Sequence, residues 1–70
     1  MRNYNVTVLE RAILEKKRVR IMYLSDGVIT ERLIKPFCIE GQSVKAYCYL
    51  RRSKRTFKIE GILSAQMTEK

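Results

Sequence analysis

The sequence predicts a small, mainly β domain in which one N-terminal α-helix precedes a closed or nearly closed barrel of five short strands. After Lys17 the spacing of apolar residues changes from intervals of three and four to alternation. Turn-forming residues then recur at short intervals along the rest of the chain. With 70 residues the chain is long enough for one compact domain and too short for two, so we expect a single domain over residues 1–70.

The N-terminal segment is predicted to be helical from about residue 6 to residue 17. Apolar residues at helical spacing form one stripe: Val6, Leu9, Ala12 and Ile13. The start of the helix is open, because Thr7 and Glu10 have the spacing of a capping box and Asn5 is a competing cap. Lys16–Lys17 suit the C-terminal end, where the helix dipole favours cations.

Five strands are predicted in the barrel, which spans about residues 18–67. Their approximate ranges are 18–23, 28–34, 44–50, 55–59 and 62–67. Ser25-Asp26-Gly27 is typical of a hairpin turn, since Asp and Gly tolerate a positive φ. Pro36 cannot donate a ladder hydrogen bond and therefore belongs at a strand end, an edge or a bulge. Such short strands favour a barrel, because closure removes exposed edges.

The third predicted strand alternates cleanly between two faces. One face would carry Val44, Ala46, Cys48 and Leu50, and the other Lys45, Tyr47 and Tyr49. The tight turn that follows, from Arg51 to Lys54, is basic, with three cations among its four residues.

The charge balance points to an anionic partner. Fifteen Lys and Arg residues against seven Asp and Glu residues give a formal net charge of +8, and so strong a field attracts polyanions. Nucleic acid is the first candidate partner. Anionic lipid and acidic small ligands are alternatives, as is a basic surface that only keeps the protein in solution.

The chain shows no pattern typical of an enzyme, and we expect neither a catalytic residue nor a cofactor. It contains no histidine that could activate a thiol, and Cys38 and Cys48 stand ten residues apart, which does not match the paired spacing of a zinc site. We therefore expect no metal, and two reduced, structural cysteines that are buried. No signal peptide or membrane-spanning run is visible, so we expect a cytoplasmic protein with no membrane partner.

Four segments together resemble the WYL domain family in order and spacing: Arg18–Tyr23, Glu31–Pro36, Ala46–Arg51 and Arg55–Ile59. The resemblance covers about residues 12–62. It implies an SH3-like or Sm-like barrel, a module that in bacterial regulators of transcription and phage defence usually follows a winged-helix DNA-binding domain and senses nucleic acid or nucleotide-like ligands. Because no helix-turn-helix accompanies it here, the resemblance implies a stand-alone module or a fragment of a larger regulator from a bacterium or phage.

Two positions depart from the family pattern. Gln42-Ser43-Val44 occupy the place of the Trp-Tyr-Leu motif that names the family. Gly61 stands where an arginine of the family's polar pocket commonly precedes the final isoleucine. The resemblance therefore implies the fold more firmly than a particular ligand.

The candidate binding site centres on the basic run from Arg51 to Arg55. Tyr47, Tyr49 and Phe57 flank this run, and aromatic rings beside cations form stacking platforms for unpaired bases. The resemblance adds Tyr23 and Arg32 as pocket residues. The full set of predicted ligand- or nucleic-acid-binding residues is Tyr23, Arg32, Tyr47, Arg51, Arg52, Lys54 and Arg55.

Each part of this site has a structural alternative. The basic run could be a solvated turn, and Phe57 could belong to the core. Tyr23 could pack in the core, and Arg32 could form a surface ion pair with Glu31 or Asp26.

Two functions follow from the sequence. The first is a ligand-sensing regulatory module that binds single-stranded nucleic acid, or a nucleotide-like anionic ligand carrying phosphate, through the basic patch. The second is an SH3-like or Sm-like protein-interaction or oligomerisation module. We also expect self-association, because so small a barrel has a thin core and leaves strand edges exposed.

Overall fold

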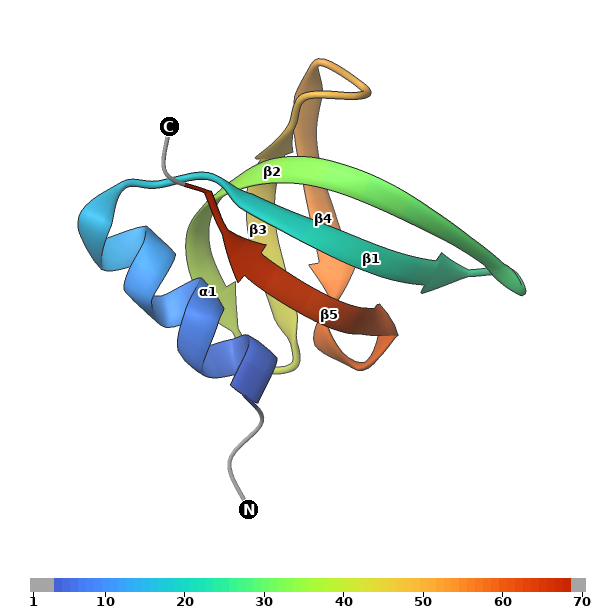
Figure 1. Ribbon diagram of the computed structural model, residues 1–70, viewed down its shortest axis with the longest axis horizontal. Coiled ribbons are helices and arrows are strands. Elements are labelled where there is room, and N and C mark those ends of the chain that lie inside the picture. Colours follow the sequence, from blue (N-terminus) through green and yellow to red (C-terminus); the bar gives the residue numbers. More distant parts are fainter. Residues whose placement is uncertain (1–3, 69–70) are drawn as a thin grey trace.

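The computed structural model describes residues 4–68, so residues 1–3 and 69–70 of the predicted domain span lie outside the described part (Figure 1). One helix precedes five strands, and the predicted mainly β fold is confirmed. The elements are α1 (Tyr4–Glu15), β1 (Val19–Ser25), β2 (Val28–Glu40), β3 (Ser43–Cys48), β4 (Ser53–Lys58), the short 3-10 helix η1 (Ile59–Gly61) and β5 (Ile62–Met67).

The five strands form one antiparallel sheet in the order β4-β3-β2-β1-β5. The sheet is strongly bent, and the long β1–β2 hairpin extends away from α1 (Figure 1). No ladder joins the two edge strands β4 and β5 within the described residues, so the barrel is not closed by backbone pairing. η1 instead carries the chain from β4 to β5.

A tyrosine side chain bridges this open seam. The Tyr23 hydroxyl of β1 accepts a hydrogen bond from the backbone N–H of Lys58 in β4, at 3.0 Å. The Tyr23 ring also meets the Phe57 ring edge to face, with centroids 5.0 Å apart and an interplanar angle of 84°. These two contacts hold β4 to β1 where no ladder does.

The helix ends two residues earlier than predicted, at Glu15. Lys16 has a φ of 56° in the left-handed region, and the Lys17 N–H donates to the Ala12 carbonyl at 2.9 Å, which is the arrangement of a Schellman motif. The helix also begins before both predicted caps. Asn5 lies inside it, where its side chain donates to the Ile62 carbonyl at 2.9 Å and ties α1 to β5.

The β1–β2 turn is confirmed as a hairpin. Asp26 and Gly27 have φ values of 53° and 76°, and Ser25 pairs with Val28 across them. Two successive residues with positive φ in a two-residue loop define a type I′ turn, the type whose twist matches that of the strands.

The second strand runs through Pro36 to Glu40, beyond the predicted end at Ile34. The strand continues past Pro36 because it bulges there: the register with β3 shifts between Pro36 and Cys38, and Phe37 is the extra residue. A bulge was one of the three places predicted for this proline. The third strand is shorter than predicted and ends at Cys48. Leu50, predicted to share a strand face with Val44, Ala46 and Cys48, lies instead in the turn with 65% of its surface exposed.

The core lies between the concave side of the sheet and α1, which packs on β5 and β2. Its buried residues are Leu9, Ala12, Val19, Ile21, Ile34, Val44, Ala46, Cys48, Phe57, Ile62 and Ala65. Phe57 is only 4% exposed and therefore belongs to the core, so it is not a stacking platform. Among the described residues no helix combines the length and apolar character needed to cross a membrane.

Candidate nucleic-acid interface

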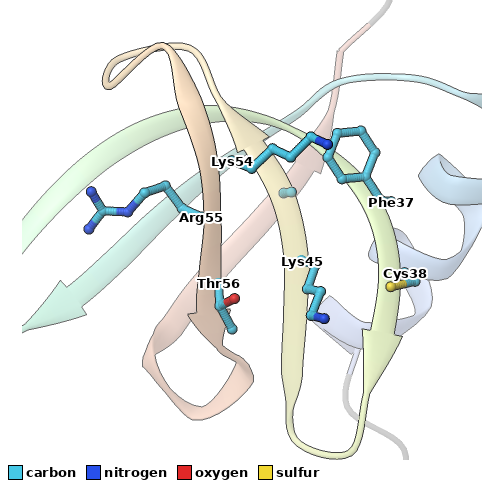
Figure 2. Close-up of a pocket in the computed structure, with 7 residues that line it drawn as sticks. Phe37, Cys38, Lys45, Lys54, Arg55 and Thr56 are labelled. Atoms are coloured by element: carbon cyan, nitrogen blue, oxygen red, sulfur yellow. The ribbon is translucent and has the colours of Figure 1, made fainter.

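The alternation of β3 and β4 divides the predicted site between two faces of the sheet. Val44 pairs with Phe57, both buried, which defines the inner face. Two residues along, Arg55 falls on this same inner side, whereas its neighbour Lys54 falls on the outer side. Figure 2 shows the two side chains pointing in opposite directions. The basic run is therefore not one continuous patch.

The outer face of β2, β3 and β4, called the outer face below, carries a row of two lysines and a tyrosine. Tyr47 in the middle strand pairs with Lys35 of β2 on one side and with Lys54 of β4 on the other. Cross-strand partners have Cβ atoms about 5 Å apart, so the Tyr47 side chain leaves the sheet between those of two lysines. Lys54 and Tyr47 belong to the predicted site, and Lys35 was not predicted.

A second aromatic ring extends this row towards the β3–β4 turn. The rings of Tyr47 and Tyr49 meet edge to face with centroids 5.0 Å apart. The guanidinium carbon of Arg18 lies 5.8 Å from the centre of the Tyr49 ring, within the range of a cation–π contact. The two tyrosines thus lie together, with Lys35 and Lys54 paired beside Tyr47 and with Arg18 beside Tyr49.

The turn itself adds two exposed arginines. Arg51 and Arg52 lie in the segment Tyr49–Arg52 that joins β3 to β4, and Arg52 has a φ of 55° in the left-handed region. The last cross-strand pair before the turn is Cys48 with Ser53, so the Tyr47–Lys54 pair is only one step away. The turn arginines therefore lie at one end of the outer face.

The bulge in β2 creates a hollow at the centre of the outer face. Phe37 is the bulged residue and is 43% exposed, and the next cross-strand row consists of Cys38, Lys45 and Thr56. These side chains line a hollow of about 380 Å³. Figure 2 shows them around it, with Lys54 reaching over Phe37. The Lys54 ammonium lies 5.9 Å from the centre of the Phe37 ring.

Sequence reasoning missed Phe37, Lys35 and Lys45. The signal for Phe37 was present in Pro36, because a proline inside a strand marks a bulge and a bulge changes which face the next side chain takes. Lys45 forms a 3.1 Å ion pair with Glu40, but both side chains are more than half exposed, so the pair contributes little and leaves Lys45 able to exchange partners.

On the inner face, Arg32 does not form the surface ion pair considered from the sequence. Its Nε donates to the Thr30 hydroxyl at 3.2 Å, and its Nη1 lies 3.8 Å from the Cys48 Sγ as a hydrogen-bond donor. Glu31 pairs with Arg20 instead, at 3.1 Å. Arg32 is therefore tied to the wall of the sheet.

Hydrogen-bond donors around the Cys48 thiol lower its pKa. Burial is the largest single influence and raises the pKa, but the Arg51 and Leu50 N–H groups and the Arg32 guanidinium favour the thiolate and together outweigh burial. Both cysteines are free, as predicted. Cys48 is fully buried, whereas Cys38 is only half-buried at the rim of the hollow, so the prediction of two buried cysteines is correct for Cys48 alone.

The structure also gives a reason for the glycine at position 61. A Cβ atom built there would lie 2.9 Å from Cε1 of Tyr23 and 3.0 Å from the Leu24 carbonyl oxygen. An arginine side chain cannot begin at this point unless the backbone and the Tyr23 ring move. Gly61 therefore leaves room for the ring of Tyr23, the side chain that bridges the seam.

Within residues 4–68, no three His, Cys, Asp or Glu side chains gather closely enough to hold a metal ion. Comparison with curated proteins finds no match. Among solved structures, one similar fold is that of proteasome accessory factor B/C (PafBC) of Arthrobacter aurescens, with a TM-score of 0.86 and 24% sequence identity. The match covers 93% of this chain and only 11% of PafBC, so the chain spans about a ninth of that protein. The family model of the WYL domain matches residues 4–67, and the chain belongs to the WYL domain family.

Proposed function

We propose that this WYL domain is a regulatory module that binds single-stranded nucleic acid through its outer face. The observation that carries the proposal is the row Lys35–Tyr47–Lys54, in which an aromatic ring is flanked across three strands by two cations. Membership in the WYL domain family supports the regulatory part. The proposal includes no catalytic step, and it places the module in the cytoplasm.

The chemistry of the outer face favours single strands over duplexes. Aromatic rings on an open sheet can stack only against bases that are themselves unpaired, while lysine and arginine neutralise the phosphates. Tyr49 and Phe37 are 38% and 43% exposed, so both rings are accessible. A duplex offers phosphates to the same cations but keeps the faces of its bases stacked, so it would use only part of this surface.

A small phosphate-bearing ligand could use the same cations, and the length of the ligand distinguishes the two possibilities. A strand of several nucleotides contacts the hollow, the tyrosines and the turn together. A mononucleotide contacts only one of them. We therefore expect affinity to rise steeply from a mononucleotide to an oligonucleotide of about ten nucleotides, within the range covered by one small barrel. Equal affinities would favour a small-ligand sensor.

The direct test is a fluorescence-anisotropy titration of the domain with a single-stranded oligonucleotide over a range of salt concentrations. If three to five phosphates are engaged, the slope of log K against log salt should lie near −2 to −3.5, at roughly −0.7 per phosphate. A slope near zero, or no binding at low salt, would contradict the proposal.

A second function, self-association, is favoured by a separate observation. The outer side of β1 and its neighbours carries exposed apolar residues, namely Met22, Leu24, Ile29 and Leu63. Leu24 pairs directly with Ile29 across the β1–β2 hairpin. Light scattering should show a mass above that of the monomer, and replacing Leu24 by Ser should return the protein to a monomer. A wild-type protein that stays monomeric at high micromolar concentration would rule this function out.

A further inference from the structure

We infer that the hollow at the β2 bulge is a binding site for one unpaired nucleobase, stacked on Phe37, with Lys54 and Lys45 contacting the flanking phosphates. The inference rests on the proposed function and assigns a specific subsite to it. Its components are the bulge, the exposed ring, and two lysines of the neighbouring strands, of which Lys54 reaches the ring (Figure 2).

The bulge explains why a large aromatic residue lies on the surface at all. In its second half β2 pairs with β3 alone, and Pro36 has no N–H to give to a ladder, which favours the bulge found just after it. The extra residue could then be any small or polar one. Here it is Phe37, left 43% exposed in the middle of a basic face.

The side chains around Phe37 suit a nucleobase. The hollow is lined by two lysines, the Thr56 hydroxyl, the Cys38 thiol and parts of Ala46 and Arg55, and none of the lining residues is acidic. The flat Phe37 ring offers the π-face that stacking requires for any base. The Thr56 hydroxyl can donate to or accept from the edge of a base, which adds a polar contact to the stacked one.

The positions of the lysines also fit. Lys54 belongs to the cross-strand row of Tyr47, and Lys45 to the next row, with Cys38 and Thr56. Rows two residues apart along a strand are separated by about 7 Å, and Phe37 lies at the bulge between them. A base on Phe37 would therefore lie between the rows from which the two lysines extend, and the exposed Lys45 can exchange Glu40 for a phosphate.

In the free protein the Lys54 ammonium occupies the face of the Phe37 ring, 5.9 Å from its centre. This cation–π contact is weak because the site is exposed to water. An incoming base replaces the contact by stacking, while its phosphate provides a stronger partner for the released ammonium group. Lys54 thus covers the ring until a strand binds.

The test uses two single strands that differ only in their bases. One is an oligothymidylate, and the other is an abasic strand with the same number of phosphates. Replacing Phe37 by Leu removes the π-face and keeps an apolar side chain of similar size. It should weaken binding of the oligothymidylate about 5- to 150-fold, because stacking on an aromatic residue is worth about 1–3 kcal/mol per base. Binding of the abasic strand and the salt slope should not change, since no charge is removed.

A matched control is Tyr4→Leu. Tyr4 is also an exposed aromatic residue, but it belongs to α1 and not to a strand of the outer face. Tyr4→Leu should leave the affinity for both strands unchanged. A second variant, Phe37→Trp, reports on stacking independently of stability, because the chain contains no other tryptophan. Its fluorescence should be quenched by the oligothymidylate and not by the abasic strand.

The outcomes separate this inference from the proposed function. If the wild-type domain binds oligothymidylate with a steep salt slope while Phe37→Leu binds equally well, or if Phe37→Trp is not quenched by a strand that anisotropy shows to be bound, the base site is wrong and the proposed function stands. If the wild-type domain binds neither strand, both are overturned.

Discussion

Lys54 and Arg55 are neighbouring, exposed residues of β4. Two single variants, Lys54→Gln and Arg55→Gln, each lose one positive charge and therefore have the same net charge. They differ in the face of the sheet that loses the charge. Lys54 lies on the outer face beside Tyr47 and Phe37, whereas Arg55 points to the opposite side (Figure 2). If the outer face binds the strand, only Lys54→Gln should weaken binding specifically.

The size of the effect follows from counterion release. One phosphate contact on a single strand contributes about 0.7 to the slope of log K against log salt. Because 0.1 M salt is tenfold below 1 M, where counterion release contributes nothing, the same contact raises log K by about 0.7 at 0.1 M salt. This corresponds to roughly a fivefold higher affinity. Lys54→Gln should therefore make the slope shallower by about 0.7 and weaken binding about fivefold. Arg55→Gln should change the slope by much less.

Anisotropy titrations of the wild-type domain and both variants against one oligonucleotide, at four or more salt concentrations, measure these slopes. Circular dichroism should first show that both variants are folded, as expected for exposed side chains of an edge strand. Equal losses of slope in the two variants would mean that only net charge matters. A larger loss in Arg55→Gln would move the site to the inner face. Either result refutes the assignment of the outer face.

Three further predictions concern the seam and the thiol. Gly61→Ala should lower the free energy of unfolding by about 1–3 kcal/mol in urea titrations, because its Cβ meets the Tyr23 ring and a backbone oxygen; an unchanged midpoint would contradict the close packing. Tyr23→Phe should cost about 1 kcal/mol through the lost hydrogen bond from Lys58, and a variant as stable as wild type would show that the bond does not hold the seam. Because the pKa of Cys48 is lowered in the folded state, its contribution to stability is lost as the pH falls through the folded-state pKa. Arg32→Gln should raise that pKa, as seen in the ultraviolet absorbance of the thiolate; a lower pKa would contradict the arrangement.

Local chemistry explains the parts of the fold that the sequence predicted well. The Asp26–Gly27 turn follows from residues that accept a positive φ, and β5 has the predicted bounds because Gly61 interrupts the pattern just before it. The helix end at Glu15 could not be predicted in the same way, since Lys16, the residue in the left-handed conformation, has no special preference for it.

The candidate site was predicted in composition but not in arrangement. Alternation along a strand places Lys54 and Arg55 on opposite faces. Counting the charges of the basic run treats them as one patch and misses this division. The exposure of Phe37 depends on a bulge, and the position of a bulge changes the face of every residue near it. The role of Tyr23 at the seam depends on contacts with β4, thirty-five residues away in sequence, which no local pattern reveals.

The most direct test of single-strand binding by the outer face is chemical-shift mapping of the backbone amides by NMR during titration with a short single-stranded oligonucleotide. The largest shifts should fall on Lys35, Phe37, Tyr47 and Lys54, with small shifts on the outer side of β1. An equal concentration of duplex should produce smaller shifts at Phe37 than the single strand does. Shifts confined to Tyr23 and the inner face, or identical maps for single strand and duplex, would contradict the proposed interface.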